Sequence, residues 1–161
     1  MMQTLISNTG PLLALSGTGH LELIKHLYGT VTVPVAVHNE LIHGGGSGFG
    51  VDAYTKADWI EVETECDVDP LLLAQLDAGE SAVIALALQR KTASVLIDER
   101  RARKIARQVY GLNVMGTVRI LLESKNAGLI GNVGIILGMM RRNGYWIHDA
   151  IVDHALRAAN E

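Results

Sequence analysis

The chain has 161 residues, of which 48% are hydrophobic and 19% charged, a composition that supports a buried core and excludes an intrinsically disordered chain. Its single cysteine, Cys66, excludes an internal disulfide framework and a multi-cysteine zinc site, and is compatible with a reducing cytoplasm. A net charge of -3 argues, as an average, against a nucleic-acid partner. We expect a single domain over residues 1–161 and a cytoplasmic location.

The first part of the chain alternates strand and helix patterns. Residues 4–7 are a short apolar run that predicts a strand, and turn-forming residues at 8–11 stop it. Helical spacing of leucine and isoleucine predicts a helix over 20–27. A β-branched run at 30–33 predicts a second strand, and the helix that follows it ends at a glycine-rich stretch, residues 44–50, which is the best candidate for a flexible loop.

The rest of the chain continues this alternation. The patterns predict strands over 59–63, 94–97 and 112–115 and helices over 71–76, 77–88, 99–110, 117–126, 133–142 and 149–159. Strands that alternate with helices favour an α/β fold, a three-layer α/β/α sandwich around a mainly parallel sheet of Rossmann-like type. The longest later uncharged stretch, residues 126–140, is shorter than the roughly 20 apolar residues of a membrane span, so we expect no membrane association.

The charges are segregated along the chain. Seven of the fourteen basic residues fall between Arg90 and Arg107, whereas nine of the seventeen acidic residues fall between Asp52 and Glu80. The net charge therefore hides a local basic segment. Aromatic residues make up only 4% of the chain, which disfavours folds that hold single strands on aromatic platforms.

Four polar residues lie where an α/β topology would bring them together: Asn8, Glu40, Glu80 and Asp98. Ligand sites in parallel sheets lie beyond the carboxyl ends of the strands. Carboxylates that converge there raise each other's pKa unless a cation neutralises them, and oxygen ligands suit Mg²⁺ or Mn²⁺. Each residue also has a structural interpretation: Asn8 and Asp98 as turn or cap residues, Glu80 as a first-turn residue favoured by the helix dipole, and Glu40 as a solvated residue.

The sequence resembles the PIN-domain ribonucleases, in particular compact prokaryotic members of the toxin-antitoxin, VapC-like type. The resemblance covers nearly the whole chain, and its specificity comes from the order and spacing of several segments. These are Ile6–Leu12, Val33–Pro34 followed by Glu40, Leu76–Glu80 leading into Ala85–Ala87, and Val95–Glu99 with Ala102–Arg103.

The resemblance implies a divalent-metal-dependent ribonuclease that uses Mg²⁺ or Mn²⁺ to hydrolyse phosphodiester bonds in RNA. It places Asn8, Glu40, Glu80 and Asp98 at the four acidic positions of the metal site, with the three carboxylates as catalytic residues. Glu99 is either an auxiliary ligand or an N-terminal helix residue. The resemblance further implies a toxin role, with RNA, an antitoxin protein and a second copy of the chain as partners.

Substrate contacts are expected from two hydroxyls and a basic helix. Thr9 lies beside the first position, and Thr117, at a helix start, is placed to meet a phosphate or water. The basic helix begins beside Asp98 and is expected either to hold an RNA backbone or to be a solvated surface helix. Its basic residues are Arg100, Arg101, Arg103, Lys104 and Arg107.

Asn8 departs from the family pattern, in which the first acidic position is Asp. An amide oxygen can coordinate a metal but carries no charge, so metal affinity should fall. The alternative hypothesis is therefore a catalytically weak or inactive PIN-like module that binds RNA or a protein. A small-molecule phosphohydrolase is a third hypothesis, which the lack of a glycine-rich phosphate loop after the first strand disfavours.

Overall fold

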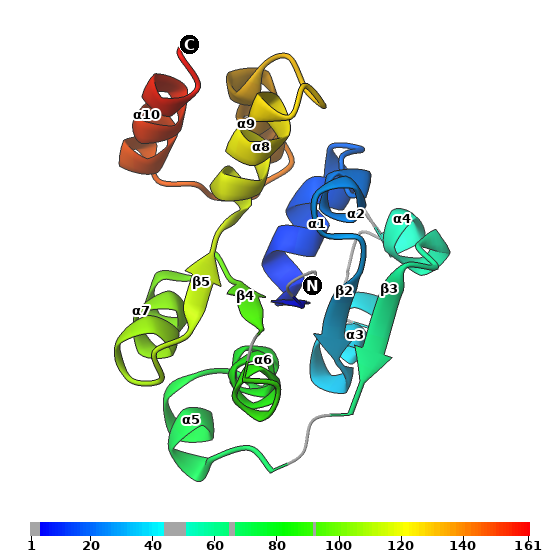
Figure 1. Ribbon diagram of the computed structural model, residues 1–161, viewed down its shortest axis with the longest axis vertical. Helices are drawn as coiled ribbons and strands as arrows, with labels where there is room; N and C mark the ends of the chain where they lie inside the picture. Colours follow the sequence, from blue (N-terminus) through cyan, green and yellow to red (C-terminus); the bar gives the residue numbers. More distant parts are fainter. Residues whose placement is uncertain (1–3, 44–50, 65–66, 92) are drawn as a thin grey trace.

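The computed structural model describes residues 4–43, 51–64, 67–91 and 93–161, and its centre is a five-stranded, all-parallel sheet (Figure 1). The strand order is β3-β2-β1-β4-β5. The strands are β1 (Leu5–Ser7), β2 (Val31–Pro34), β3 (Ile60–Glu63), β4 (Ser94–Leu96) and β5 (Asn113–Met115). This confirms the predicted α/β fold. The glycine-rich stretch at 44–50 and Cys66 lie outside the described residues.

Ten helices are present in the described residues, and they connect the strands and extend the fold beyond β5. Right-handed crossovers place the helices that follow β1 and those that follow β4 on opposite faces of the sheet. The helices are α1 (Thr9–Gly17), α2 (Glu22–Tyr28), α3 (Val35–His43), α4 (Val51–Lys56), α5 (Pro70–Gln75), α6 (Ala78–Gln89), α7 (Arg100–Gln108), α8 (Thr117–Asn126), α9 (Val133–Arg142) and α10 (Asp149–Ala158).

The direction in which successive strands are added across the sheet reverses between β1 and β4. From β1 the chain moves to β2 and β3 at one edge, then crosses to β4 and continues to β5 at the other edge. At the junction the backbone N–H of Asn8 donates to the carbonyl oxygen of Leu96, at 3.0 Å. In open parallel sheets the crevice for a ligand lies at this switch point, outside the carboxyl ends of the strands.

Helix α1 corrects the sequence prediction of a turn at residues 8–11, because the helix already begins at Thr9. Pro11 is tolerated there, since the N–H groups of a first turn have no acceptor within the helix. The helix buries Pro11, Leu12, Ala14, Leu15 and Ser16, so it is enclosed on several sides. A helix that is apolar on all sides has no amphipathic period to detect. The short helix α4 was also not predicted.

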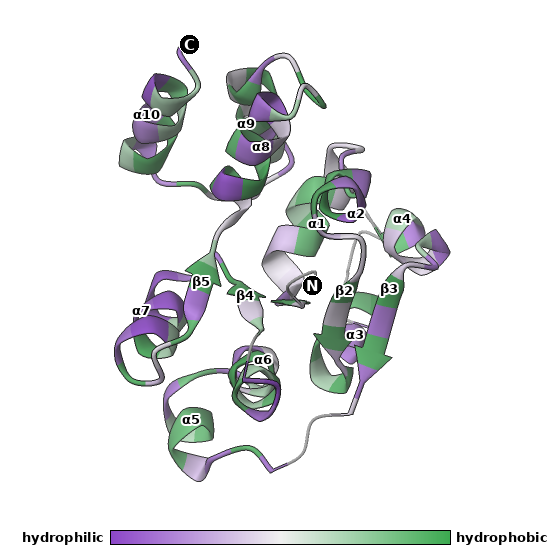
Figure 2. Ribbon diagram, in the orientation of Figure 1, coloured by the Kyte–Doolittle hydropathy of each residue, from purple (hydrophilic) through white to green (hydrophobic). Residues whose placement is uncertain are grey.

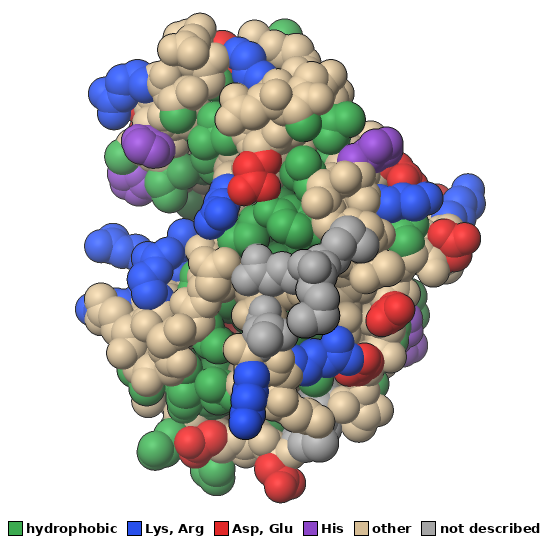
Figure 3. Space-filling view, viewed as in Figure 1, with side chains coloured by type: hydrophobic (Ala, Val, Ile, Leu, Met, Phe, Trp, Pro, Cys, Tyr) green, Lys and Arg blue, Asp and Glu red, His purple; other side chains and the backbone are tan. Residues whose placement is uncertain are grey.

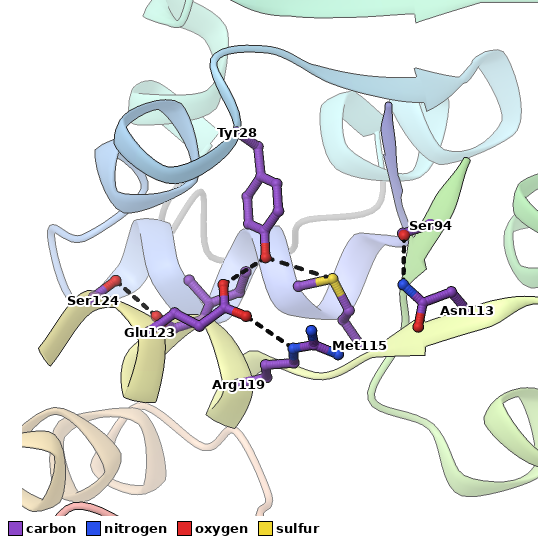
Figure 4. Close-up of polar contacts among 8 residues, drawn as sticks. Tyr28, Ser94, Asn113, Met115, Arg119, Glu123 and Ser124 are labelled. Carbon is purple, nitrogen blue, oxygen red and sulfur yellow. Dashed lines mark hydrogen bonds and ion pairs between the residues drawn. The ribbon is translucent and has the colours of Figure 1, made fainter. Parts of the chain in front are cut away.

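The last three helices, α8, α9 and α10, pack together. Of these, α8 also packs against α1 and α2. Figure 4 shows the polar part of this junction, where the Tyr28 hydroxyl donates to Oε2 of Glu123 at 2.6 Å. Arg119 Nε donates to the other oxygen of the same carboxylate, at 2.9 Å. Burial, with the neighbouring Glu123 carboxylate, raises the pKa of Tyr28. Across the described part of the chain, no helix is long and apolar enough to cross a membrane.

Candidate active site

Asn8 and Glu40 face the same point beside the first turn of α6. A Cβ atom on Gly79 would lie 2.7 Å from Glu40 Oε1 and 3.4 Å from Asn8 Oδ1. Asn8 occupies the N-cap position of α1, yet its side chain makes no capping hydrogen bond. The cap interpretation of Asn8 is therefore wrong for its side chain. The missing side chain of Gly79 lets the Glu40 carboxylate approach the backbone closely, and a larger residue here would push that carboxylate aside.

Thr9 holds Glu40 in this position. Its hydroxyl donates to Glu40 Oε2 at 2.7 Å, which joins α1 to α3 across the carboxyl end of the sheet. Glu40 is solvent-exposed, as its structural interpretation predicted, but its carboxylate is oriented by a partner from another element. The sequence placed Thr9 beside Asn8, whereas the structure gives it Glu40 as a partner.

Glu80 combines a cap role with a buried carboxyl group. Its backbone N–H donates to Asp77 Oδ1 at 2.8 Å, and its own Oε1 accepts from the Asp77 N–H at 3.3 Å, which forms a capping box. The residue is 7% exposed. Burial raises the pKa of Glu80 to about 7, and the charges of Asp77 and Glu99 contribute in the same direction. A carboxyl group with this pKa can hold a proton near neutral pH.

Three donors fix the Asp98 carboxylate. Thr117 donates its backbone N–H to Oδ1 at 2.7 Å and its hydroxyl to Oδ2 at 2.5 Å, and the Tyr145 hydroxyl also donates to Oδ2. Asp98 does not cap α7. That role belongs to Glu99, whose carboxylate accepts the N–H groups of Arg101 and Ala102 at 3.1 and 2.8 Å. Of the two interpretations of Glu99, the structure supports the one as a residue at the N-terminal end of a helix.

Tyr145 is a site residue that sequence reasoning missed. It lies in the connection between α9 and α10, and its hydroxyl also lies 3.1 Å from the position that a Cβ on Gly10 would take. The ring therefore fills the space between the start of α1 and Asp98. Burial raises the pKa of Tyr145, and the Asp98 carboxylate adds to the effect. No periodic pattern marks this residue, because it stands in an irregular connection.

Arg103 differs from the other basic residues of α7. Its Nη1 donates to the carbonyl oxygen of Ile97 at 2.8 Å, and burial lowers its pKa. A Cβ on Gly116 would lie 2.8 Å from Arg103 Nη1 and 2.9 Å from Asp98 Oδ1, so Gly116 leaves room for both groups. Arg103 thus belongs to the surroundings of Asp98. The other four are exposed: Arg100, Arg101, Lys104 and Arg107.

The exposed cations of α7 border a hollow in the surface. Figure 2 colours much of this helix as hydrophilic. Figure 3 shows a notch between α7 and the group α8–α10, with Lys and Arg side chains gathered on its α7 side. Because α7 begins directly after Asp98 and Glu99, this cationic edge leads from the surface to the carboxylates.

A comparison with protein-family models matches residues 4–161 to the family described as PIN domain. The chain belongs to the PIN-domain family. A search of curated proteins and a search of solved structures each found no match. PIN domains are generally nucleases, enzymes that hydrolyse phosphodiester bonds, and they typically use divalent metal ions.

The side-chain atoms at the PIN-domain site of this chain are of the kind that binds a divalent ion. Its donors are carboxylate and amide oxygens, which Mg²⁺ and Mn²⁺ prefer. Asn8 Oδ1 and Glu40 Oε1 already lie close together beside Gly79. Among the described residues, however, no three His, Cys, Asp or Glu side chains lie close enough together to hold an ion. The structure thus brings together the Asn8 amide and the Glu40 carboxylate. The carboxyl groups of Glu80 and Asp98 make hydrogen bonds to other residues instead.

Proposed function

We propose that this PIN domain is a divalent-metal-dependent ribonuclease that hydrolyses phosphodiester bonds in RNA. The observation that carries the proposal is the arrangement at the switch point of the sheet. There Asn8 and Glu40 both direct a side-chain oxygen toward Gly79, and Asp98 is fixed where the exposed cations of α7 begin. A cationic edge that leads to oxygen ligands is what a polyanionic substrate of a metal-dependent hydrolase requires.

Each site residue has a proposed task. Asn8, Glu40, Glu80 and Asp98 would hold Mg²⁺ or Mn²⁺, which when bound would supply an activated water and stabilise the developing negative charge. Thr9 orients Glu40 through a 2.7 Å hydrogen bond. Thr117 and Tyr145 orient Asp98 through donors to both of its oxygens. With a pKa raised to about 7, the Glu80 carboxyl can also hold or release a proton at neutral pH.

The proposed substrate contacts are electrostatic. The four exposed basic residues of α7 would bind phosphates of the RNA backbone, without regard to sequence. Arg103 would stabilise charge close to Asp98 instead, because its guanidinium is folded back onto Ile97. The negative net charge of the chain does not oppose this role, since the cations lie together on one helix.

Asn8 favours a second candidate function, a catalytically weak or inactive PIN-domain module that binds RNA or a protein. The amide offers an oxygen at the shared space beside Gly79 but no charge. Three carboxylates would have to balance up to four positive charges if two ions bind. In this case RNA binding by α7 would persist while cleavage is absent.

The toxin role, with an antitoxin protein and a second copy of the chain as partners, is a proposal from the resemblance in sequence. On α10, where an exposed apolar stripe would suit such an interface, Ile151 is 49% exposed but Ala155 is fully buried. A small partner gene directly upstream, whose product blocks RNA cleavage when the two proteins are mixed, would support this role. Cleavage that is unaffected by the neighbouring product would argue against it.

Cleavage of a mixed RNA pool with Mn²⁺ or Mg²⁺ tests the ribonuclease proposal. Asp98→Asn should reduce the cleavage rate by at least about a hundredfold, because the substitution removes a charge at the reacting centre. The matched control is Asp58→Asn, at an exposed residue between α4 and β3, which should leave the rate unchanged. Unchanged cleavage by Asp98→Asn would contradict the proposed chemistry. RNA binding without cleavage by the unsubstituted protein would favour the inactive module.

A further inference from the structure

The Asp98 carboxylate has most of its acceptor sites occupied by protein donors. A carboxylate offers about four lone-pair sites on its two oxygens. Oδ2 accepts from two hydroxyls, that of Thr117 at 2.5 Å and that of Tyr145. Within the described part of the chain, Oδ1 accepts only the Thr117 N–H, at 2.7 Å. The acceptor site that is left free is therefore on Oδ1.

Thr117 and Tyr145 contribute to this arrangement in different ways. Thr117 begins α8 and donates to both oxygens of Asp98, so it fixes the orientation of the carboxylate by itself. The Tyr145 hydroxyl comes from the connection between α9 and α10, which belongs to the C-terminal group of helices (Figure 1). Because the orientation is already fixed, the main effect of the Tyr145 donor is that it occupies the second acceptor site of Oδ2.

The Tyr145 hydroxyl has a fixed position. The missing side chain of Gly10 lets it approach the first turn of α1 closely, because a Cβ atom there would lie 3.1 Å from the hydroxyl oxygen. The N–H of Tyr145 donates to the Met140 carbonyl oxygen at 2.9 Å. Two residues earlier, Asn143 Nδ2 donates to the Gly17 carbonyl oxygen at 3.0 Å. These contacts tie the segment both to α9 and to α1.

The number of free oxygens on a carboxylate affects which divalent ion it suits. Ca²⁺ takes about six to eight oxygen ligands and can bind both oxygens of one carboxylate. Mg²⁺ requires near-octahedral geometry and keeps several of its waters, so a single carboxylate oxygen is sufficient for it. Asp98 is half-buried, and its free acceptor site is on Oδ1. It therefore has the form that suits Mg²⁺ and not the form that chelates Ca²⁺.

We propose that Tyr145 is a positioning residue that determines metal specificity: it occupies Oδ2 of Asp98, so that Asp98 coordinates a divalent ion through Oδ1 alone and Mg²⁺ is favoured over Ca²⁺. This inference rests on the ribonuclease proposal and specifies the ion at its site. Without the Tyr145 hydroxyl, one acceptor site of Oδ2 is open and Ca²⁺ can bind both oxygens. The group α8–α10, which supplies none of the four proposed metal ligands, thus sets the ion preference of a site on the sheet.

The experiment measures Mg²⁺ and Ca²⁺ binding to the metal-free protein by titration calorimetry, without RNA. Tyr145→Phe removes the hydroxyl and keeps the ring. It should tighten Ca²⁺ binding at least about fivefold more than Mg²⁺ binding. Damage to the fold would weaken both ions, and a gain in free negative charge on Asp98 would strengthen both. A change in the ratio of the two affinities therefore reports the second coordinating oxygen.

Three further variants serve as controls. Tyr110→Phe should leave both affinities unchanged, because the Tyr110 hydroxyl makes no hydrogen bond within the described residues. In the Asp98→Asn background, Tyr145→Phe should no longer shift the ratio, since the carboxylate is gone. Gly10→Ala keeps the hydroxyl but places a Cβ atom 3.1 Å from it, and should shift the ratio in the same direction as Tyr145→Phe. It provides the same test if Tyr145→Phe does not fold.

Two results would overturn the inference and leave the ribonuclease proposal standing. The first is an unchanged affinity ratio for Tyr145→Phe in a protein that melts cooperatively and binds Mg²⁺. The second is an equal shift of the ratio with and without the Asp98 carboxylate, because the effect would then not act through Asp98. If Asp98→Asn binds both ions as tightly as the unsubstituted protein, Asp98 is not a metal ligand and both proposals fail.

Discussion

Among the single residues of the site, Asn8 is the most informative. The helix start that it occupies would allow its side chain to cap α1, yet the amide turns toward Glu40 and Gly79 instead. The Asn8 side chain forgoes a capping hydrogen bond worth about 1 kcal/mol, so we infer that its orientation serves another contact. The side-chain oxygens of Asn8 and Glu40 beside Gly79 mark where a bound ion would make that contact.

Replacement of Asn8 by Asp should tighten Mn²⁺ binding by roughly tenfold, because a second carboxylate would face the space beside Gly79. Without metal the same variant should be less stable, since two carboxylates then repel each other. Titration calorimetry and thermal melts with and without Mn²⁺ measure the two effects. Asn126→Asp, at an exposed residue at the end of α8, is the control of equal charge. Equal Mn²⁺ affinity of both variants would place Asn8 outside the metal site.

The raised pKa of Glu80 gives the stability of the protein a pH dependence. The pKa of this carboxyl group is near its ordinary value of 4.5 in the unfolded chain, but is raised to about 7 in the folded protein. The folded state therefore binds the proton more tightly, and the free energy of unfolding falls as the pH rises through this interval.

Glu80→Gln removes this dependence, because the amide stays neutral. The melting temperature of the variant, relative to the unsubstituted protein, should therefore rise between about pH 5 and about pH 8, on top of any constant loss from the capping box. Glu61→Gln, at an exposed residue of the edge strand β3, should show no such change. Parallel melting curves of Glu80→Gln and the unsubstituted protein at all pH values would contradict the shifted pKa.

At the scale of elements, α7 has two functions on two faces. Ala102 and Ala106 are buried and the helix packs against β5, while four cations are exposed on the outer face. Arg103 stands at the boundary, folded back onto Ile97. The helix can therefore carry a dense charge without loss of packing, because its apolar residues Ala102, Ile105 and Ala106 pack against the core.

Charge reversal on α7 tests whether the exposed face binds RNA. Arg101→Glu combined with Lys104→Glu should reduce the slope of log affinity against log salt by about 1.4 or more, since each of the two lost phosphate contacts contributes roughly 0.7 for single strands. Lys25→Glu combined with Lys56→Glu makes the same charge change on α2 and α4, and should leave the slope nearly unchanged. Equal slopes for both double variants would remove α7 from the RNA-binding face.

At the scale of the whole molecule, the C-terminal helices must be held against the sheet for the site to exist. Tyr145 comes from this group, whereas Asn8, Glu40 and Asp98 come from the sheet and its crossovers. The two parts meet through α8, whose packing on α1 and α2 includes the hydrogen bond from Tyr28 to Glu123. A change at this junction should therefore act on stability and on the site together.

Tyr28→Phe should lower the free energy of unfolding by about 1–2 kcal/mol, because the Glu123 carboxylate loses a donor at the half-buried junction. Urea denaturation measures the change. Tyr110→Phe is the control, at a tyrosine whose hydroxyl makes no hydrogen bond within the described residues. In the background of Glu123→Gln the effect of Tyr28→Phe should shrink; an equal loss in both backgrounds would show that the Tyr28–Glu123 hydrogen bond contributes nothing.

The sequence was sufficient for the sheet and for most of its helices. Buried strands such as β4 are short apolar runs, and helices such as α7 carry a clear polar and apolar face, so both leave a local pattern. The pattern fails for α1, which is buried on several sides and contains Pro11, and for the short α4. In these elements tertiary packing, not local periodicity, decides the structure.

The candidate site also has some features that the sequence predicts and others that only the tertiary structure determines. That Asn8 and Asp98 lie at the same edge of the sheet could be inferred from the sequence, because each follows a strand and a parallel sheet brings the carboxyl ends of its strands to one edge. That the two strands are neighbours came from the structure. Only the tertiary structure decided that Tyr145 fixes Asp98, that Glu99 and not Asp98 caps α7, and that Trp146 is exposed while Trp59 is buried. These features depend on space and donors supplied by residues that are distant in the chain, and such contacts leave no trace in a local sequence pattern.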